Sequence, residues 1–161
     1  MALLLRTVDK DYRWFKEAAA EFLAHDDSPA DPIADLKTDK NRLSVYVISD
    51  DRSNLERIVR AVAVGRHRID HAAYVVFDSK VIEEAGIGIE EVVGTTKDAG
   101  VNNWHRDLVL SGKKLAALAK GILRDGEEVS RILRERMVQL VDQGIKDGEL
   151  PEEFKEKLTK K

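Results

Sequence analysis

Residues 43–78, LSVYVISDDRSNLERIVRAVAVGRHRIDHAAYVVFD, decide the predicted fold because they read as strand, helix and strand. The first seven residues are rich in β-branched and aromatic side chains and are apolar on both faces, which is typical of a strand covered on both sides. Ser53 and Glu56 have the spacing of a capping box, and an apolar helical stripe follows until Gly65. Residues 72–77 form a second apolar strand. This order predicts a right-handed parallel crossover.

Shorter patterns flank this unit on both sides. Residues 3–8 read as an N-terminal strand, and Asp9 is placed to cap a helix that runs to about residue 24. The polar residues 25–42 contain two prolines and five aspartates, and we interpret them as a long surface loop that is either a lid or disordered. Residues 90–94 are predicted as an edge strand.

Aromatic side chains gather in the helix predicted after Asp9. Phe15, Ala18, Ala19 and Phe22 lie at helical spacing, and Tyr12 and Trp14 flank this stripe. Such a stripe is typical of a helix that faces the core, so we expect these aromatic side chains to be buried.

The C-terminal third of the chain has helical periodicity and no strong strand pattern. Residues 104–110 are predicted as a short helix and residues 111–123 as a second one. Asp125 and Glu128 form a second capping pair, which opens the longest predicted helix. Pro151 then starts a last helix.

These patterns predict an α/β (or α+β) fold. We expect a small, mostly parallel sheet of three or four strands with covering helices in residues 1–99. Residues 100–161 are predicted to be an all-helical C-terminal extension, which packs on the first domain or is used for self-association.

Composition limits the classes of function. The 161 residues carry 27 basic and 30 acidic side chains, so the net charge of −3 provides no global attraction for nucleic acid or an anionic membrane. The chain has no cysteine, which excludes disulfides, thiolate metal sites and a cysteine nucleophile. No apolar run has the length of a membrane span, so we expect a cytoplasmic protein without membrane contact.

Asp50 and Asp51 are candidate catalytic residues because they follow the first strand of the predicted crossover, where open α/β sheets bind ligands. Two aspartates there have the chemistry to hold a divalent metal. The simpler interpretation is a helix start with solvated aspartates. The candidate anion-binding residues lie at the two ends of the predicted helix and are Arg52, Ser53, Arg66, His67 and Arg68. Nearby acidic side chains nearly cancel their charge.

His105 and Asp107 are a second candidate catalytic pair, as general base and orienting group if Ser111 supplied a nucleophile. On the predicted helix, however, residues two apart point to different sides, so the pair is more simply structural. The string HRD at residues 105–107 also opens the catalytic loop of protein kinases, but Gly112 stands where that loop has asparagine. The sequence predicts no cofactor and no metal.

We therefore expect a small binding or regulatory domain that acts through contacts with a protein partner or with a second copy of the chain. The long C-terminal apolar stripe exceeds what a small sheet covers, which favours a homo-oligomer. Two alternatives stay open. One is a metal-assisted enzyme acting on a phosphorylated or nucleic-acid substrate, and the other is a nucleic-acid-binding regulator that uses the arginine-rich residues 65–71.

Overall fold

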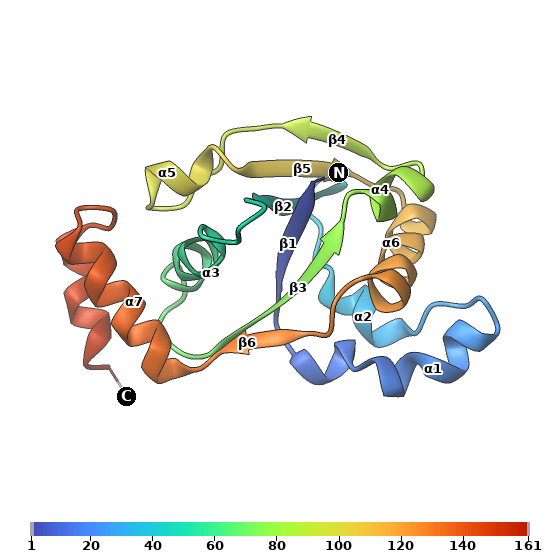
Figure 1. The fold of residues 1–161 in the computed structure, drawn as a ribbon, viewed down its shortest axis with the longest axis horizontal. Helices are drawn as coiled ribbons and strands as arrows, with labels where there is room; N and C mark the ends of the chain where they lie inside the picture. Colours follow the sequence, from blue (N-terminus) through green and yellow to red (C-terminus); the bar gives the residue numbers. More distant parts are fainter. Residues whose placement is uncertain (1, 161) are drawn as a thin grey trace.

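The structure is a computed structural model, and it describes residues 2–160. Its centre is a six-stranded antiparallel sheet with the strand order β4-β5-β2-β1-β3-β6 (Figure 1). The strands are β1 (Leu3–Val8), β2 (Arg42–Ile48), β3 (Ala72–Asp78), β4 (Gly88–Glu91), β5 (His105–Val109) and β6 (Ser130–Ile132). The protein therefore belongs to the α+β class.

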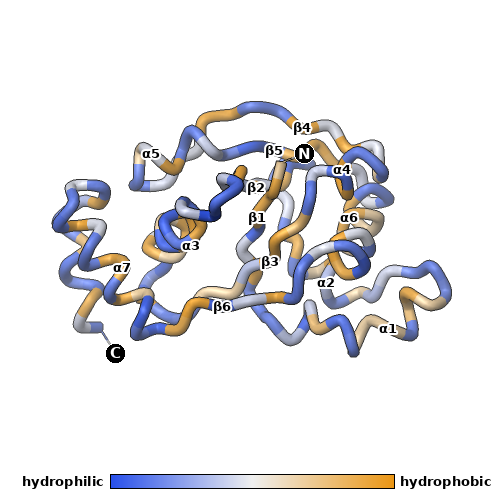
Figure 2. Tube along the Cα trace, viewed as in Figure 1, coloured by the Kyte–Doolittle hydropathy of each residue, from blue (hydrophilic) through white to orange (hydrophobic). Residues whose placement is uncertain are grey.

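Helices cover both faces of this sheet, so the molecule has three layers. The helices are α1 (Lys16–Ala24), α2 (Ala30–Asp35), α3 (Leu55–Ala63), α4 (Lys80–Glu84), α5 (Ala99–Asn102), α6 (Gly112–Asp125) and α7 (Arg134–Lys146), with 3-10 helices η1 (Asp11–Trp14) and η2 (Glu152–Leu158). Figure 1 shows α3 and α7 on one side of the sheet and α1, α2, α4 and α6 on the other. An apolar cluster lies between the sheet and the helices on each of its two faces. Hydrophobic residues accordingly follow the central strands (Figure 2).

The predicted parallel sheet of three or four strands is wrong, although its strands β2 and β3 exist. Both strands pair antiparallel with β1, so they run in the same direction but are separated by it. Leu5 of β1, for example, is the register partner of both Tyr46 and Val76. The unit is a split βαβ arrangement, in which α3 connects two strands across an inserted third. The ligand crevice expected between adjacent parallel strands is therefore absent from the described sheet.

The prediction of an all-helical C-terminal part is also wrong, because β5 and β6 lie in it. Residues 105–109 alternate sides as a strand and pair with both β2 and β4. The predicted longest helix is interrupted by β6, which pairs with β3, and α7 begins only at Arg134. Pairing with strands distant in sequence thus outweighs the local helical pattern.

The N-terminal helix predicted from Asp9 is broken. Phe15 has an extended backbone between η1 and α1, with φ −67° and ψ 120°. Trp14 is buried as predicted, but Tyr12, Phe15 and Phe22 are 53%, 47% and 44% exposed. The expectation that all these aromatic side chains face the core is therefore wrong.

Residues 25–42, which we interpreted as a lid or disordered loop, contain the short helix α2. Its Asp35 and the following Leu36 are buried, which ties the segment to the core. Within residues 2–160, none of the helices has the length and apolar character needed to cross a membrane.

Candidate functional site

A hollow beside the end of the β1–β3 ladder brings together three of the predicted anion-binding residues. Val8 and Ala73 are register partners, so the residues that follow β1 lie next to those that precede β3. The segment that leaves α3 completes the rim. We call this hollow of about 350 Å³ the basic hollow, and it is lined by Asp9, Lys10, Arg66, His67, Arg68, Asp70, His71 and Ala73.

Both carboxylates of the basic hollow already have partners. Asp70 accepts hydrogen bonds from the backbone N–H of His71, at 2.8 Å, and from Arg68 Nη2, at 3.5 Å. The backbone bond from His71 is the main reason that the pKa of Asp70 is lowered. Asp9 pairs with Lys37, and this hydrogen bond lowers the pKa of Asp9.

The remaining basic side chains of the hollow are less engaged. Arg66 Nη1 donates to the carbonyl oxygen of His71 at 3.2 Å. Within residues 2–160, the side chains of Lys10 and His67 make no hydrogen bond and no ion pair. Because Asp9 and Asp70 are partnered, whereas Lys10 and Arg66 have no carboxylate partner among the described residues, the basic hollow has a positive excess that suits an anion.

Arg52 and Ser53, the other two predicted anion-binding residues, lie elsewhere. They precede α3, whereas the basic hollow lies beyond its other end, and the nine residues of α3 span about 13 Å at roughly 1.5 Å per residue. Arg52 has a left-handed backbone with φ 59° and forms a two-pronged ion pair with Glu127, with Nη1 and Oε2 at 3.0 Å. The predicted anion-binding residues are thus divided between the basic hollow and the start of α3.

Asp50 and Asp51 lie in the turn between β2 and α3. Asp51 accepts hydrogen bonds from the backbone N–H of Ser53 at 3.0 Å and from Ser49 Oγ at 2.8 Å. These bonds, the one from Ser53 first, lower the pKa of Asp51 to about 2. Among residues 2–160, no group of three or more His, Cys, Asp or Glu side chains is arranged to hold a metal ion. Asp51 is therefore a turn-forming residue, and Asp50 is an exposed neighbour.

The predicted capping box at the start of α3 does not form. The N-cap residue is Asn54, and its side chain makes no capping bond. Asn54 Oδ1 instead accepts from the backbone N–H of Ser49 at 2.9 Å, and its Nδ2 donates to the carbonyl oxygen of Val47 at 3.2 Å. Asn54 thus joins the end of β2 to the start of the helix.

His105 and Asp107 are brought together, for a reason that the sequence reading missed. On strand β5, residues two apart point to the same face, and His105 Nε2 lies 3.4 Å from Asp107 Oδ1. Their register partners on β2 are Tyr46 and Ser44. Ser111 does not join them, because its hydroxyl caps α6 by accepting from the N–H of Lys114 at 3.2 Å.

These side chains line a second cavity of about 290 Å³, which we call the polar cleft. Residues 92–95, which follow β4, line one part of it, and the exposed Asp39 and Lys40 line another. The lining residues are Asp39, Lys40, Arg42, Ser44, Tyr46, Val92, Val93, Gly94, Thr95, His105 and Asp107. Burial raises the pKa of the Tyr46 hydroxyl, which therefore stays protonated at neutral pH.

The sequence reading missed a buried ion-pair network centred on Asp98, the N-cap of α5. Arg57 donates to both Asp98 oxygens at 2.8 Å, and Arg60 Nη2 donates at 2.9 Å. Glu149 completes the network through Arg57 Nε, at 2.9 Å, and through Arg60. Burial raises the pKa of Asp98, but the two arginines outweigh it, so the net shift is downward. Two arginines one helical turn apart were the only sequence signal.

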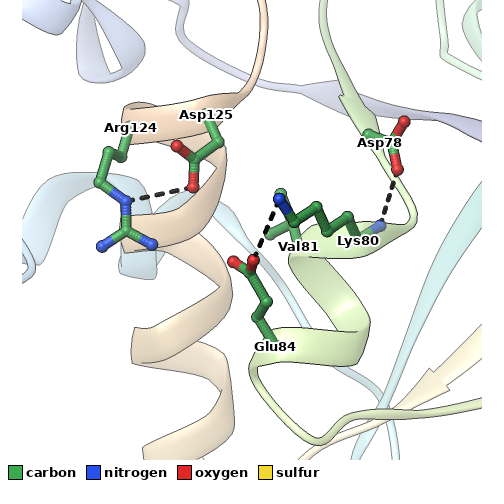
Figure 3. Close-up of a pocket in the computed structure, with 6 residues that line it drawn as sticks. All are labelled: Asp78, Lys80, Val81, Glu84, Arg124 and Asp125. Atoms are coloured by element: carbon green, nitrogen blue, oxygen red, sulfur yellow. Dashed lines mark hydrogen bonds and ion pairs between the residues drawn. The ribbon is translucent and has the colours of Figure 1, made fainter.

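A hollow of about 390 Å³ between α4 and α6 is a weaker candidate (Figure 3). Its charged side chains pair with their own neighbours. Arg124 Nε lies 3.1 Å from Asp125, and Lys80 Nζ lies 3.5 Å from Glu84. The carboxylate of Asp78 accepts from the backbone N–H of Lys80 at 2.8 Å. The charged side chains of this hollow therefore already have partners within the protein.

Neither the basic hollow nor the polar cleft is identified by likeness to another protein. Comparison with known proteins finds no matching family model, no similar curated protein and no similar solved structure. Function must therefore be inferred from side-chain geometry and charge.

Proposed function

We propose that this protein is a small binding domain and that its basic hollow takes an acidic or phosphorylated segment of a partner protein. The observation that carries the proposal is the positive excess of the hollow. Lys10, Arg66 and His67 line it, while Asp9 and Asp70 are already partnered. Arginine and histidine donors suit carboxylate or phosphate oxygens. A cytoplasmic location is part of this proposal, supported by the lack of cysteine.

A protein segment suits the basic hollow better than nucleic acid does. Nucleic-acid binding commonly uses about 6–10 phosphate contacts along a continuous basic surface. The basic hollow has fewer cations, and Asp9 and Asp70 interrupt them. Arg52, which would extend the surface, lies at the other end of α3 and pairs with Glu127. A metal-assisted enzyme is less supported, because Asp51 is engaged in its turn.

The test is a titration of ¹⁵N-labelled protein with a phosphoserine peptide, its unphosphorylated form and its glutamate form. We expect the amide signals of residues 66–71 and Lys10 to move with the phosphorylated and glutamate peptides only. The Arg66→Gln/Arg68→Gln variant should bind at least about ten-fold more weakly, because each lost charged hydrogen bond costs roughly 1.5–3 kcal/mol.

The matched control is Lys113→Gln/Arg124→Gln, which removes the same charge from α6. It should bind like the wild type. Equal affinity of the Arg66→Gln/Arg68→Gln variant would refute the site. Tighter binding of single-stranded RNA, with a steep salt dependence, would show that the ligand is a nucleic acid and not a protein segment.

Self-association is a second candidate function. Exposed aromatic side chains near the N-terminus favour it, and not the C-terminal apolar stripe on which the sequence-based expectation rested. The C-terminal apolar stripe is used inside the molecule, since Met137 and Val141 are fully buried. Among residues 2–160, the exposed aromatic side chains are Tyr12 on η1, Phe15 between η1 and α1, and Phe22 on α1. We propose that this aromatic surface, defined by those three residues, contacts a second copy of the chain.

A further inference from the structure

The polar cleft lies on a part of the sheet whose two faces differ sharply. Leu43 and Val45 of β2 and Leu108 of β5 point to the opposite face, where they are buried in an apolar cluster. On the cleft side Tyr46 is buried in the second apolar cluster, but the neighbouring Ser44 and Asp107 are polar and only partly buried, so these two side chains need another explanation.

The ring of His105 is held in one orientation. Its Nδ1 lies 2.7 Å from the carbonyl oxygen of Val92, and its edge packs on Tyr46 with ring centres 5.4 Å apart at an interplanar angle of 68°. Because a carbonyl oxygen only accepts, Nδ1 carries the hydrogen. Nε2 is therefore the nitrogen that faces Asp107. Such prior ordering lowers the entropic cost of binding a ligand.

Asp107 is a partly buried carboxylate of the cleft that makes no hydrogen bond with a protein donor among residues 2–160. Its side chain is only 15% exposed. Its contacts are to His105 Nε2 at 3.4 Å and to the cationic Arg42 Nη1 at 3.7 Å, and neither contact has hydrogen-bond geometry. Within the same described residues, the hydroxyls of Ser44 and Tyr46 make no hydrogen bond either. The carboxylate of Asp107 and the hydroxyls of Ser44 and Tyr46 are therefore free to bond a ligand that enters the cleft.

Charges of the opposite sign line the same cavity. Lys40 is exposed, and Arg42 has a 40% exposed side chain that also pairs with Glu90. Asp39 lies beside them and offsets part of their charge. The cleft thus offers a carboxylate inside and cations in its exposed part, which is complementary to a molecule with a positive and a negative end.

We propose that the polar cleft is a ligand site for a small zwitterion of the α-amino acid class. The ammonium group donates to Asp107 and is also within reach of the Tyr46 and Ser44 hydroxyls, while the carboxylate meets Lys40 and Arg42. The volume of about 290 Å³ agrees with a ligand of this size, because it is at the lower end of small-molecule pockets, which span roughly 300–1,000 Å³. This site is separate from the basic hollow and independent of its proposed role.

The test is a titration of the ¹⁵N-labelled full chain with the common free amino acids at millimolar concentration. Each is compared with its N-acetyl derivative, which lacks the ammonium charge, and with the corresponding amine, which lacks the carboxylate. At least one free amino acid should move the amide signals of Val92 and His105. Both derivatives should bind at least about ten-fold more weakly, since each loses one charged contact.

Two variants of cleft residues test whether these side chains bind the ligand. Asp107→Asn should bind the same amino acid at least about ten-fold more weakly, and Tyr46→Phe several-fold more weakly. The control is Glu91→Gln, which removes an 85% exposed carboxylate from the neighbouring strand and should bind like the wild type. Equal binding by Asp107→Asn, equal binding of the N-acetyl derivatives, or no response to any free amino acid would each overturn the proposal.

Discussion

At the scale of single residues, the buried carboxylate of Asp35 holds the N-terminal segment together. It accepts hydrogen bonds from the backbone N–H groups of Asp9, at 2.9 Å, and Lys10, at 3.3 Å. Trp14 Nε1 donates to it at 3.0 Å. Asp35 therefore joins α2 to the end of β1 and to η1, and it fixes the backbone from which Lys10 enters the basic hollow.

Replacing Asp35 with alanine should destabilise the protein by about 2–4 kcal/mol, because the change leaves buried donors without an acceptor. Urea unfolding measures this loss. The control is Asp31→Ala, an exposed carboxylate on the same helix, for which we expect a change within about 0.5 kcal/mol. A loss as small as that of the control would mean that water replaces the carboxylate at no cost.

Single residues were also where the sequence was least informative. Five aspartates lie in residues 25–42, and nothing in the local pattern distinguishes the buried Asp35 from the others. The sequence offers His105 and Asp107 as a candidate pair but favours a structural role for them, because it predicts a helix there. Their convergence depends on strand geometry, so the error in secondary structure became an error about the site.

At the scale of elements, the Asp98 network fastens α3 to α5 and to the turn after α7. These ion pairs require α3 and α7 to lie close together, and Gly144 of α7 allows this close approach. A Cβ atom at this position would lie 2.5 Å from Arg60 Nη1 and 3.0 Å from Leu150 Cδ1. The guanidinium of Arg60 is buried and held by Asp98, so it has little freedom to move away.

Gly144→Ala should therefore destabilise the protein by about 1–3 kcal/mol, the usual cost of overpacking, although alanine is the better helix former. The matched control is Gly112→Ala in α6, where a Cβ atom meets nothing within 4 Å. That variant should be neutral or stabilised by up to about 1 kcal/mol. Thermal unfolding of both variants measures the contrast, and equal effects would show that α7 shifts easily.

Elements with strong local patterns were predicted well, and those defined by pairing were not. The β1, β2 and β3 strands and the α3 helix were read from their apolar patterns. The β5 strand has only five residues and β6 only three, which is too short for periodicity to separate strand from helix. Both are defined by the hydrogen bonds of β2, β3 and β4, which lie far away in the sequence.

At the scale of the whole molecule, the sequence predicted strands but not their order. An apolar N-terminal strand fits a central position and an edge position equally well, and only tertiary pairing places β1 between β2 and β3. The C-terminal apolar stripe is buried inside the molecule, where α7 packs on α3 and η2. The C-terminal stripe therefore no longer supports the expectation of a homo-oligomer. The support comes from the aromatic surface formed by Tyr12, Phe15 and Phe22.

We expect self-association through the aromatic surface to be lost when Phe15 and Phe22 become polar. The wild-type sedimentation coefficient should rise with protein concentration, and the Phe15→Ser/Phe22→Ser variant should remain at the monomer value, because it removes apolar area that a second copy would bury. Folding stability should change little, since these side chains are 47% and 44% exposed in one chain.

The control for this association is Leu133→Ser, which removes a 57% exposed apolar side chain elsewhere on the surface and should leave association intact. A wild-type protein that sediments as a monomer at every accessible concentration would exclude self-association through the aromatic surface. It would leave the basic hollow unaffected, because Arg66 and Lys10 lie within a single chain and need no second copy to meet an anion.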